Sequence, residues 1–198
     1  THDDFDAATA AALAPAGEAQ AFAVLDAALA SGTLRIDDAR YRFRHELVRQ
    51  ALVDQVPPHR RLKLHRELAA RLSELDVPPA LVARHWLAAG SVREAMPWLL
   101  AAARDALRLA AFSDALRHVD PVLAHDGRHA EALRIRAEAL DALGDPRSVA
   151  AYRAAADADA GPLADDLRVK AALAQIKQGD PRGGVSALAG LSPRTAEG

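Results

Sequence analysis

A four-residue motif occurs twice in the second half of the chain, with its two copies 35 residues apart: Gly144-Asp145-Pro146-Arg147 and Gly179-Asp180-Pro181-Arg182. Self-similarity at such a period is typical of proteins built from stacked helical hairpins. Because glycine readily adopts the left-handed conformation that ends a helix, each copy predicts a turn between two helices. We therefore expect the chain from Pro79 onward to form a helical solenoid.

The composition favours the same architecture. Hydrophobic residues make up 51% of the chain but aromatic residues only 4%, because alanine supplies much of the apolar content. Alanine has the highest helix propensity, and its small side chain lets helices approach closely. The absence of cysteine excludes disulfides and thiolate metal sites.

Charge and hydropathy indicate a cytoplasmic protein. The formal net charge of -2 provides no overall field that would attract nucleic acid or an anionic membrane. No apolar run approaches the length of about 20 residues that a bilayer span needs. The first residues are polar and acidic, unlike a signal peptide.

The repeat period resembles that of tetratricopeptide (TPR) repeats, which is about 34 residues. In that register each motif glycine lies between the two helices of a repeat, and Ala137 and Ala172 occupy the small position where paired helices touch. The aromatic consensus positions are poorly filled, so these are divergent, TPR-like repeats. Residues 77–191 are expected to form this array, and residues 192–198 a flexible tail. Pro121 falls inside a predicted helix and should kink or shorten it.

The first 76 residues follow a different order. Asp4 or Asp6 can cap a helix running to about Leu13, and a second helix is expected over residues 18–30. A β-hairpin follows, because apolar and polar residues alternate on both sides of the turn Asp37-Asp38-Ala39. Two helices come next, from about Glu46 and from about His59 to Leu75. The side chains expected to face inward on these helices are Phe22, Leu25, Leu29, Leu47, Val48, Ala51, Leu52, Leu62, Leu68, Ala69, Leu72 and Leu75.

Two segments of this region resemble the winged-helix module of STAND-class nucleotide-switch ATPases. They are Tyr41–Leu52 (YRFRHELVRQAL) and Pro57–Leu68 (PPHRRLKLHREL), and the likeness is greatest to large LuxR-type and SARP-type transcriptional regulators. The resemblance implies a mainly α fold, in which residues 1–76 form a truncated winged-helix module with one β-hairpin and a long connecting helix. It also implies that the ATPase and the DNA-binding domain lie on polypeptide outside this chain.

His45 is the chief candidate site residue. In the STAND resemblance, Phe43–Arg49 matches a Met-His-Asp-type motif, with His45 at the histidine and Glu46 at the acid. The family's histidine approaches the β-phosphate of bound ADP and holds the closed state, and a helix N-terminus adds positive potential there. The resemblance therefore implies that His45 senses nucleotide in the intact parent, which would bind ATP or ADP. The alternative is that His45 only caps its helix or packs against the hairpin.

A run of basic residues follows the hairpin. The residues that could contact phosphate or another domain are Arg42, Arg44, Arg49, Arg60 and Arg61. The helix before the hairpin would enter the major groove, but its segment Ala21–Asp26 is apolar and slightly acidic, and only Gln20 could read a base edge. We do not expect direct DNA binding, although it stays open as a further alternative.

The remaining residues do not predict a metal site or a catalytic site. His125 and His129 are four residues apart, but Gly127 breaks the helix that a metal pair would need, so we expect a loop and no metal. His65 is expected to be a hydrogen-bonded core residue, and His85 a packing residue. The chain has no phosphate-binding loop and no catalytic constellation, so we expect neither a cofactor nor an enzymatic activity in it.

The sequence leaves two main functional hypotheses. The leading one is a non-catalytic regulatory or sensor fragment of a STAND-type regulator, whose repeats bind a protein or small-molecule inducer and act on other domains of the parent. The alternative is a stand-alone TPR-type scaffold for protein assembly. Pairing of an exposed end repeat with a second copy is open under both, because solenoid ends need covering.

Overall fold

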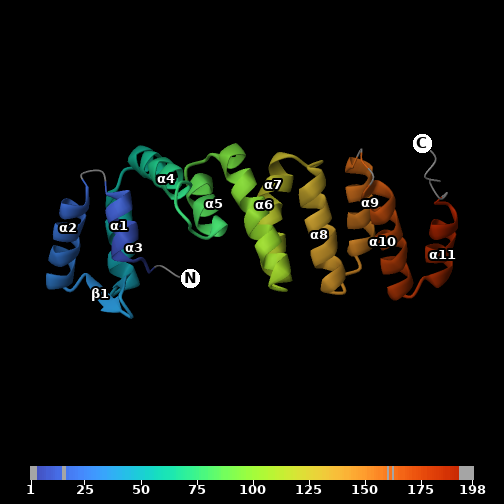
Figure 1. Ribbon diagram of the computed structural model, residues 1–198, viewed down its shortest axis with the longest axis horizontal. Coiled ribbons are helices and arrows are strands. Elements are labelled where there is room, and N and C mark those ends of the chain that lie inside the picture. Colours follow the sequence, from blue (N-terminus) through green and yellow to red (C-terminus); the bar gives the residue numbers. More distant parts are fainter. Residues whose placement is uncertain (1–3, 15–16, 160, 162, 192–198) are drawn as a thin grey trace. The chain divides into compact units, whose positions relative to one another are not determined.

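The computed structural model describes residues 4–14, 17–159, 161 and 163–191, and within them it contains eleven helices and one two-stranded antiparallel sheet (Figure 1). The expectation of a mainly helical chain with one β-hairpin is thus confirmed. The chain divides into two compact units: Thr1–Val77 with Arg84–Ser91, and Pro78–Ala83 with Val92–Gly198. The predicted boundary after residue 76 lies one residue before the first division. The predicted tail, residues 192–198, lies outside the described residues.

The first unit contains four helices and the hairpin. Its elements are α1 (Ala7–Leu13), α2 (Glu18–Ala30), β1 (Leu34–Asp37), β2 (Arg40–Phe43), α3 (Glu46–Gln55), α4 (Pro58–Leu72) and the second half of α5 (Pro79–Ala88). Asp6 is the N-cap of α1, and its carboxylate accepts a hydrogen bond of 2.6 Å from the backbone N–H of Thr9. A capping carboxylate of this kind satisfies one of the N–H groups that the first helical turn leaves without a partner.

The two strands of the hairpin pair Leu34 with Phe43 and Ile36 with Tyr41. Its two turn residues, Asp38 and Ala39, have φ angles of 45° and 62°, the left-handed pair that matches the twist of a tight hairpin. Phe5 adds a third strand-like segment, since its backbone N–H donates to the Tyr41 carbonyl at 3.1 Å and its carbonyl accepts from the Tyr41 N–H at 2.7 Å. The rings of Phe5 and Tyr41 stack with their centroids 5.7 Å apart.

The expected burial of α3 is wrong. Leu47, Val48, Ala51 and Leu52 are all exposed, and Leu47 retains 83% of its accessible surface. The helix packs instead through its opposite side, where Arg49 and Val53 are half-buried, and it contacts β2. Apolar periodicity locates a stripe on a helix, but it does not say whether a neighbour lies against that stripe.

Burial in α2 and α4 follows the prediction only in part. Leu25, Ala69 and Leu72 are buried, and Leu29 and Leu68 are half-buried. Three residues expected to face inward are exposed instead: Phe22, Leu62 and Leu75. The helix α4 ends at Leu72, one turn earlier than expected, so Leu75 lies beyond the periodic segment.

The second unit is a succession of helical hairpins. Its elements are the first half of α5, α6 (Val92–Arg108), α7 (Phe112–His125), α8 (Ala130–Ala142), α9 (Ser148–Ala158), α10 (Leu163–Lys177) and α11 (Pro181–Ala189). Helices pack in the pairs α6–α7, α8–α9 and α10–α11, and each pair packs on the next through α7–α8 and α9–α10 (Figure 1). The motif glycines Gly144 and Gly179 have φ angles of 68° and 92°, as the predicted turns require.

Small side chains fill the core between these pairs. Ala137 and Ala172 are almost fully buried, and the larger side chains of Ile135 and Val119 are buried beside such small residues. Pro121 does not end its helix, because α7 continues to His125. Among the described residues, no helix combines the length and the apolar character needed to cross a membrane.

Candidate functional site

The structure places His45 at the N-cap position of α3. Its backbone is extended, its side chain is exposed, and the side chain makes no capping hydrogen bond. The His45 side chain therefore does not cap α3, and its imidazole is exposed to solvent beside the first turn of that helix. The backbone N–H groups of such a turn give positive potential, which favours an anion there.

The five arginines singled out in the sequence do not converge on one point. Arg42 pairs with Asp37 of the hairpin at 3.7 Å, and Arg61 pairs with Asp54 at the same distance. Arg49 binds Glu46 one turn earlier in α3, and this bond holds the pKa of the Glu46 carboxyl below its usual value. Arg44 and Arg60 are exposed, and neither forms an ion pair within the part of the chain that the structure describes. These pairs are local, so the segment does not present an ordered row of cations to a phosphate backbone.

His65 forms the predicted hydrogen bond, and its partner is another histidine. The Nδ1 atoms of His65 and His85 lie 2.9 Å apart within the first unit, and the two rings are tilted by 33°. One nitrogen must donate and the other accept, so the accepting imidazole must be neutral when the bond is made. Burial, together with the nearby guanidinium of Arg84, lowers the pKa of His85 to about 4, and burial also lowers the pKa of His65.

In the second unit, charged side chains bridge the first helices of successive hairpins. We call this set the charge row: Arg104 on α6, Glu131, Arg134 and Glu138 on α8, and Lys170 on α10. Arg104 forms two bonds to Glu131, of 2.5 Å and 2.9 Å. Arg134 lies 3.9 Å from Glu131 and 3.3 Å from Glu138, and Lys170 donates to Glu138 at 3.1 Å.

The charge row alternates in sign across three helices. The guanidinium of Arg104 lowers the pKa of Glu131, and the bond from Glu131 raises the pKa of Arg104. Partly exposed ion pairs contribute little to stability, about 0 to 1 kcal/mol each, so a polar ligand could exchange for them. The charge row was not predicted from the sequence, although the spacing of residues 131, 134 and 138 places them on one helical face.

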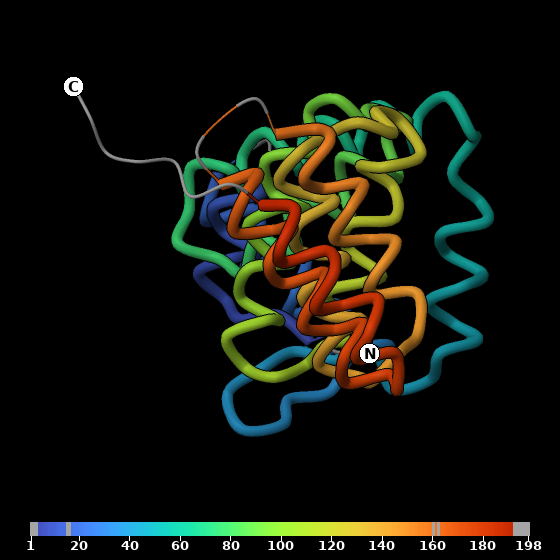
Figure 2. The backbone as a smooth tube through the Cα atoms, turned by 90° about the vertical axis from the view of Figure 1, so that its right-hand side faces the viewer, coloured from blue at the N-terminus to red at the C-terminus, as the bar shows by residue number. Residues whose placement is uncertain are grey.

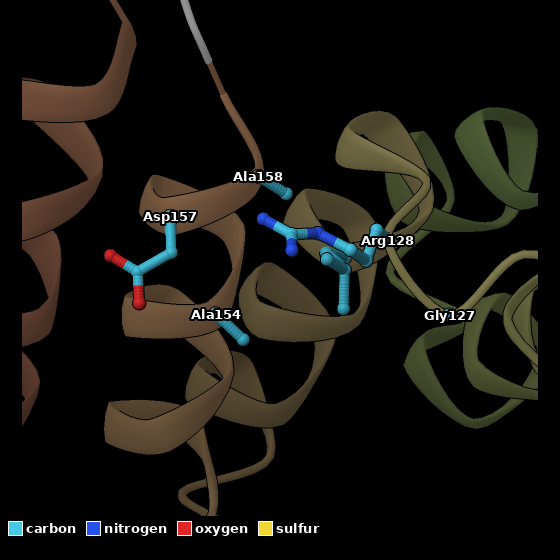
Figure 3. A pocket seen from close by; sticks show the side chains of 6 residues that line it. Gly127, Arg128, Ala154, Asp157 and Ala158 are labelled. Atoms are coloured by element: carbon cyan, nitrogen blue, oxygen red, sulfur yellow. The ribbon is translucent and has the colours of Figure 1, made fainter.

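A shallow pocket of about 340 Å³ lies beside the α7–α8 loop and the end of α9 (Figure 3). Its lining residues are Gly127, Arg128, Leu133, Ala154, Asp157 and Ala158. Arg128 extends toward α9, but the carboxylate of Asp157 points away from Arg128 in Figure 3. The two charges therefore do not converge on one ligand position, and this pocket supports no specific binding chemistry.

No cluster of metal-ligating side chains is present in the part of the chain that the structure describes. No group of three or more His, Asp or Glu side chains there could hold a metal ion. His125 is the last residue of α7, and His129 is the N-cap of α8. The Nδ1 atom of His129 accepts a hydrogen bond of 3.4 Å from the Ala132 N–H. The two histidines therefore flank a loop, as the sequence predicted.

Comparisons of this chain with models of known protein families, with curated proteins and with solved structures found no match.

Proposed function

We propose that this chain is a non-catalytic regulatory part of a STAND-type transcriptional regulator, with TPR-like repeats that bind a protein or small-molecule inducer. In this proposal the first unit is a winged-helix module that passes the binding event to a nucleotide switch outside the chain. The switch holds ATP or ADP, and the chain itself holds no cofactor. The observation that carries the proposal is the combination of the His45 segment with a hairpin array in one chain.

The order of elements in the first unit supports the winged-helix assignment. A short extended segment at Phe5, two helices and a hairpin follow one another, and Phe5 bonds to β2 in antiparallel fashion. His45 follows the hairpin directly and opens α3. This is the position that the family's ADP-sensing histidine occupies, and an exposed imidazole can donate to a phosphate oxygen there.

The second unit supports the binding role. Stacked hairpins present the same side of successive helices on one extended surface, and such surfaces are where repeat proteins bind their partners. The charge row lies on α6, α8 and α10, the first helices of the three hairpins. A polar protein segment carrying both signs of charge could replace these partly exposed pairs one for one.

The matched comparison of His45→Ala with His59→Ala in the full-length protein tests the role of His45. Both histidines are exposed in the first unit, but only His45 opens α3. We expect His45→Ala to lose bound ADP during purification and His59→Ala to retain it. The readout is the nucleotide released from denatured protein, quantified by chromatography. Equal ADP retention in the two variants would refute the sensor role.

The stand-alone scaffold is the alternative, and the gene itself distinguishes the two. A Gly-x-x-x-x-Gly-Lys-Ser/Thr segment encoded some hundreds of residues before Thr1 favours the regulator, because that loop binds the nucleotide phosphates. A gene without it favours the scaffold.

DNA binding by the first unit has weaker support. The α2 helix, which would enter the major groove, carries no Arg or Lys, and its exposed side includes Phe22, Val24 and Asp26. A gel-shift assay with random duplex at low salt checks this. A shift at micromolar protein would favour DNA binding, because phosphate contacts alone give binding under those conditions.

A further inference from the structure

Two histidines join the helices α4 and α5 within the first unit. The Nδ1 atoms of His65 and His85 lie 2.9 Å apart, and the ring centroids lie 5.2 Å apart. In Figure 2 the chain passes from α4 (teal) to α5 (green) through residues 73–78. The segment Arg84–Ser91 belongs to the first unit, whereas the residues directly before and after it belong to the second. The histidine pair therefore holds this segment against α4.

The surroundings of the pair oppose a positive charge. Ala69 and Ala89, one helical turn after each histidine, are almost fully buried. The charged side chains that act on the rings are Arg84 on α5 and Arg61 on α4, and Arg61 pairs with Asp54 of α3 at 3.7 Å. The helix α1, which packs on α4, carries no titratable side chain. A proton added to the pair is thus opposed by burial and by the guanidinium groups.

The bond between the rings depends on their protonation. One added proton can be accommodated, because a protonated imidazole still donates to a neutral one. A second proton leaves two N–H groups facing each other, and neither ring can then accept. The two imidazolium charges also repel each other and the guanidinium of Arg84. Full protonation therefore replaces an attraction between α4 and α5 with a repulsion.

We propose that the bond between His65 and His85 is a pH-sensitive switch: protonation of both rings releases the segment Arg84–Ser91 from α4, while the rest of the first unit stays folded. The helix α5 has 10 residues, and a helix of that length is marginal on its own, so its released half loses helical hydrogen bonds. In contrast, α4 has an anchor that does not titrate, because Arg71 donates at 2.7 Å to the Leu13 carbonyl at the end of α1. The switch requires no ligand and no nucleotide.

The switch opens as the pH falls. A released histidine titrates near pH 6.5, whereas burial lowers the pKa of His85 in the closed pair to about 4 and also lowers that of His65. Below about pH 6.5 the open form therefore binds more protons than the closed form, and the ratio of open to closed form rises. Between about pH 7.5 and about pH 5 we expect a rise of about tenfold, allowing for the partial exposure of the rings.

Amide hydrogen exchange of the 198-residue protein, followed by NMR at these two pH values and corrected for the intrinsic exchange rate, measures the opening. The reporting amides are those of Ala89 and Ser91, which donate to the His85 and Trp86 carbonyls in the closed form. We expect their protection to fall about tenfold at the lower pH. The amides of α4 and of the second-unit helix α8 should keep theirs.

The substitution His85→Gln tests the role of the protons. Its amide can donate and accept a hydrogen bond but does not titrate in this range, so the reporting amides should stay protected at about pH 5. His59→Gln is the matched control, since it places the same side chain on α4 at an exposed position. This variant should lose protection at the lower pH as the unchanged chain does.

Three results would overturn the proposal. The reporting amides of the unchanged chain might be equally protected at both pH values, His85→Gln might lose the same protection, or the loss might extend over α4. If His85→Gln does not fold, an NMR titration of the imidazole groups in the unchanged chain decides the question. Proton uptake by both rings below pH 6.5, together with the loss of protection, supports the switch. Uptake near pH 6.5 with full protection retained excludes it.

Discussion

The two units bury their apolar residues to very different extents. In the second unit every helix from α6 to α11 has at least one buried residue, and α8 buries six. In the first unit neither α1 nor α3 has a buried residue, and the leucines of α3 face solvent. A helix in a globular protein owes most of its stability to the face it packs, so the first unit should be the less stable of the two.

The two tryptophans allow this difference to be measured. Trp86 lies in the part of α5 that belongs to the first unit, and Trp98 lies on α6 in the second. Urea unfolding of Trp98→Phe therefore follows the first unit, and unfolding of Trp86→Phe follows the second. We expect the Trp86 transition to come at lower urea than the Trp98 transition. Coincident transitions would mean that the units unfold together.

The largest expected effect is that of Ile135→Ala in the second unit. Ile135 is fully buried on α8, so truncation removes packed methyl groups and leaves a cavity. Changes of this kind lower the free energy of unfolding by about 2 to 5 kcal/mol. The Trp98 transition reports the loss. Leu47→Ala on α3 is the matched change in the first unit and should shift the Trp86 transition by less than about 0.5 kcal/mol.

A cost of several kcal/mol for Leu47→Ala would contradict the exposure of α3. It would show that some element covers Leu47 in solution.

Close packing in the second unit extends to its last helix, and Gly184→Ala tests this. A β-carbon at Gly184 would meet the Ala172 carbonyl oxygen at 2.7 Å and clash with the Ile176 side chain. Such overpacking typically costs about 1 to 3 kcal/mol. We expect α11 to lose amide hydrogen-exchange protection first. Gly127→Ala is the control, because its nearest atom would be 3.7 Å away, and equal protection in both variants would argue against this contact.

The sequence predicted the second unit better than the first for a physical reason. In a repeat array each helix packs on its neighbours in sequence, so the turns at Gly144 and Gly179 and the small residues Ala137 and Ala172 suffice to place the helices. The apolar stripe of α3 was equally clear, yet its burial depends on an element that periodicity cannot reveal. The predicted burial is therefore wrong at Leu47 and confirmed at Ala137.

The same distinction holds for the candidate sites. His45 could be placed at the start of α3 because a local motif and a helix boundary coincide there. The bond between His65 and His85 joins residues 20 apart, and neither is part of a motif that predicts the other. The charge row joins α6, α8 and α10, so its pairing became visible only once the hairpins were stacked.

The histidine pair makes the first unit sensitive to pH. An unfolded histidine titrates near pH 6.5, whereas burial lowers the pKa of His85 to about 4 and also lowers that of His65. Below about pH 6.5 these histidines bind protons in the unfolded chain but not in the folded unit. The free energy of unfolding therefore decreases as the pH falls from 6.5 toward 4. We expect the Trp86 transition to lose about 1 to 2 kcal/mol over this range, allowing for partial exposure.

The second unit provides the internal comparison. Burial lowers the pKa of His118, one of the three histidines of this unit, so the Trp98 transition should fall less steeply than that of Trp86. His85→Leu should flatten the pH dependence of the Trp86 transition and leave that of Trp98 unchanged. A Trp86 transition that is equally steep in His85→Leu would show that other groups carry the effect.

The smallest effects are expected at two helix caps, one in each unit. Asp6 accepts from the Thr9 N–H at the start of α1, and Asp180 accepts from the Gly183 N–H at 2.9 Å at the start of α11. Removal of such a carboxylate leaves a backbone N–H of the first turn without its acceptor, and Asp6→Ala and Asp180→Ala test this separately.

The caps differ in what depends on them. Because α1 has no buried residue, its cap is a larger part of what holds the helix, and Asp6→Ala should expose its amides to exchange throughout. The α11 helix is held on α10 at Gly184, so Asp180→Ala should affect mainly its first turn. Backbone bonds lower the pKa of both carboxyls, so each contribution is complete above about pH 4 and is lost as the pH falls below the unfolded value. If both substitutions raised amide exchange along the whole helix, packing would protect α11 no better than α1. The difference in burial between the two units would then not hold at these two terminal helices.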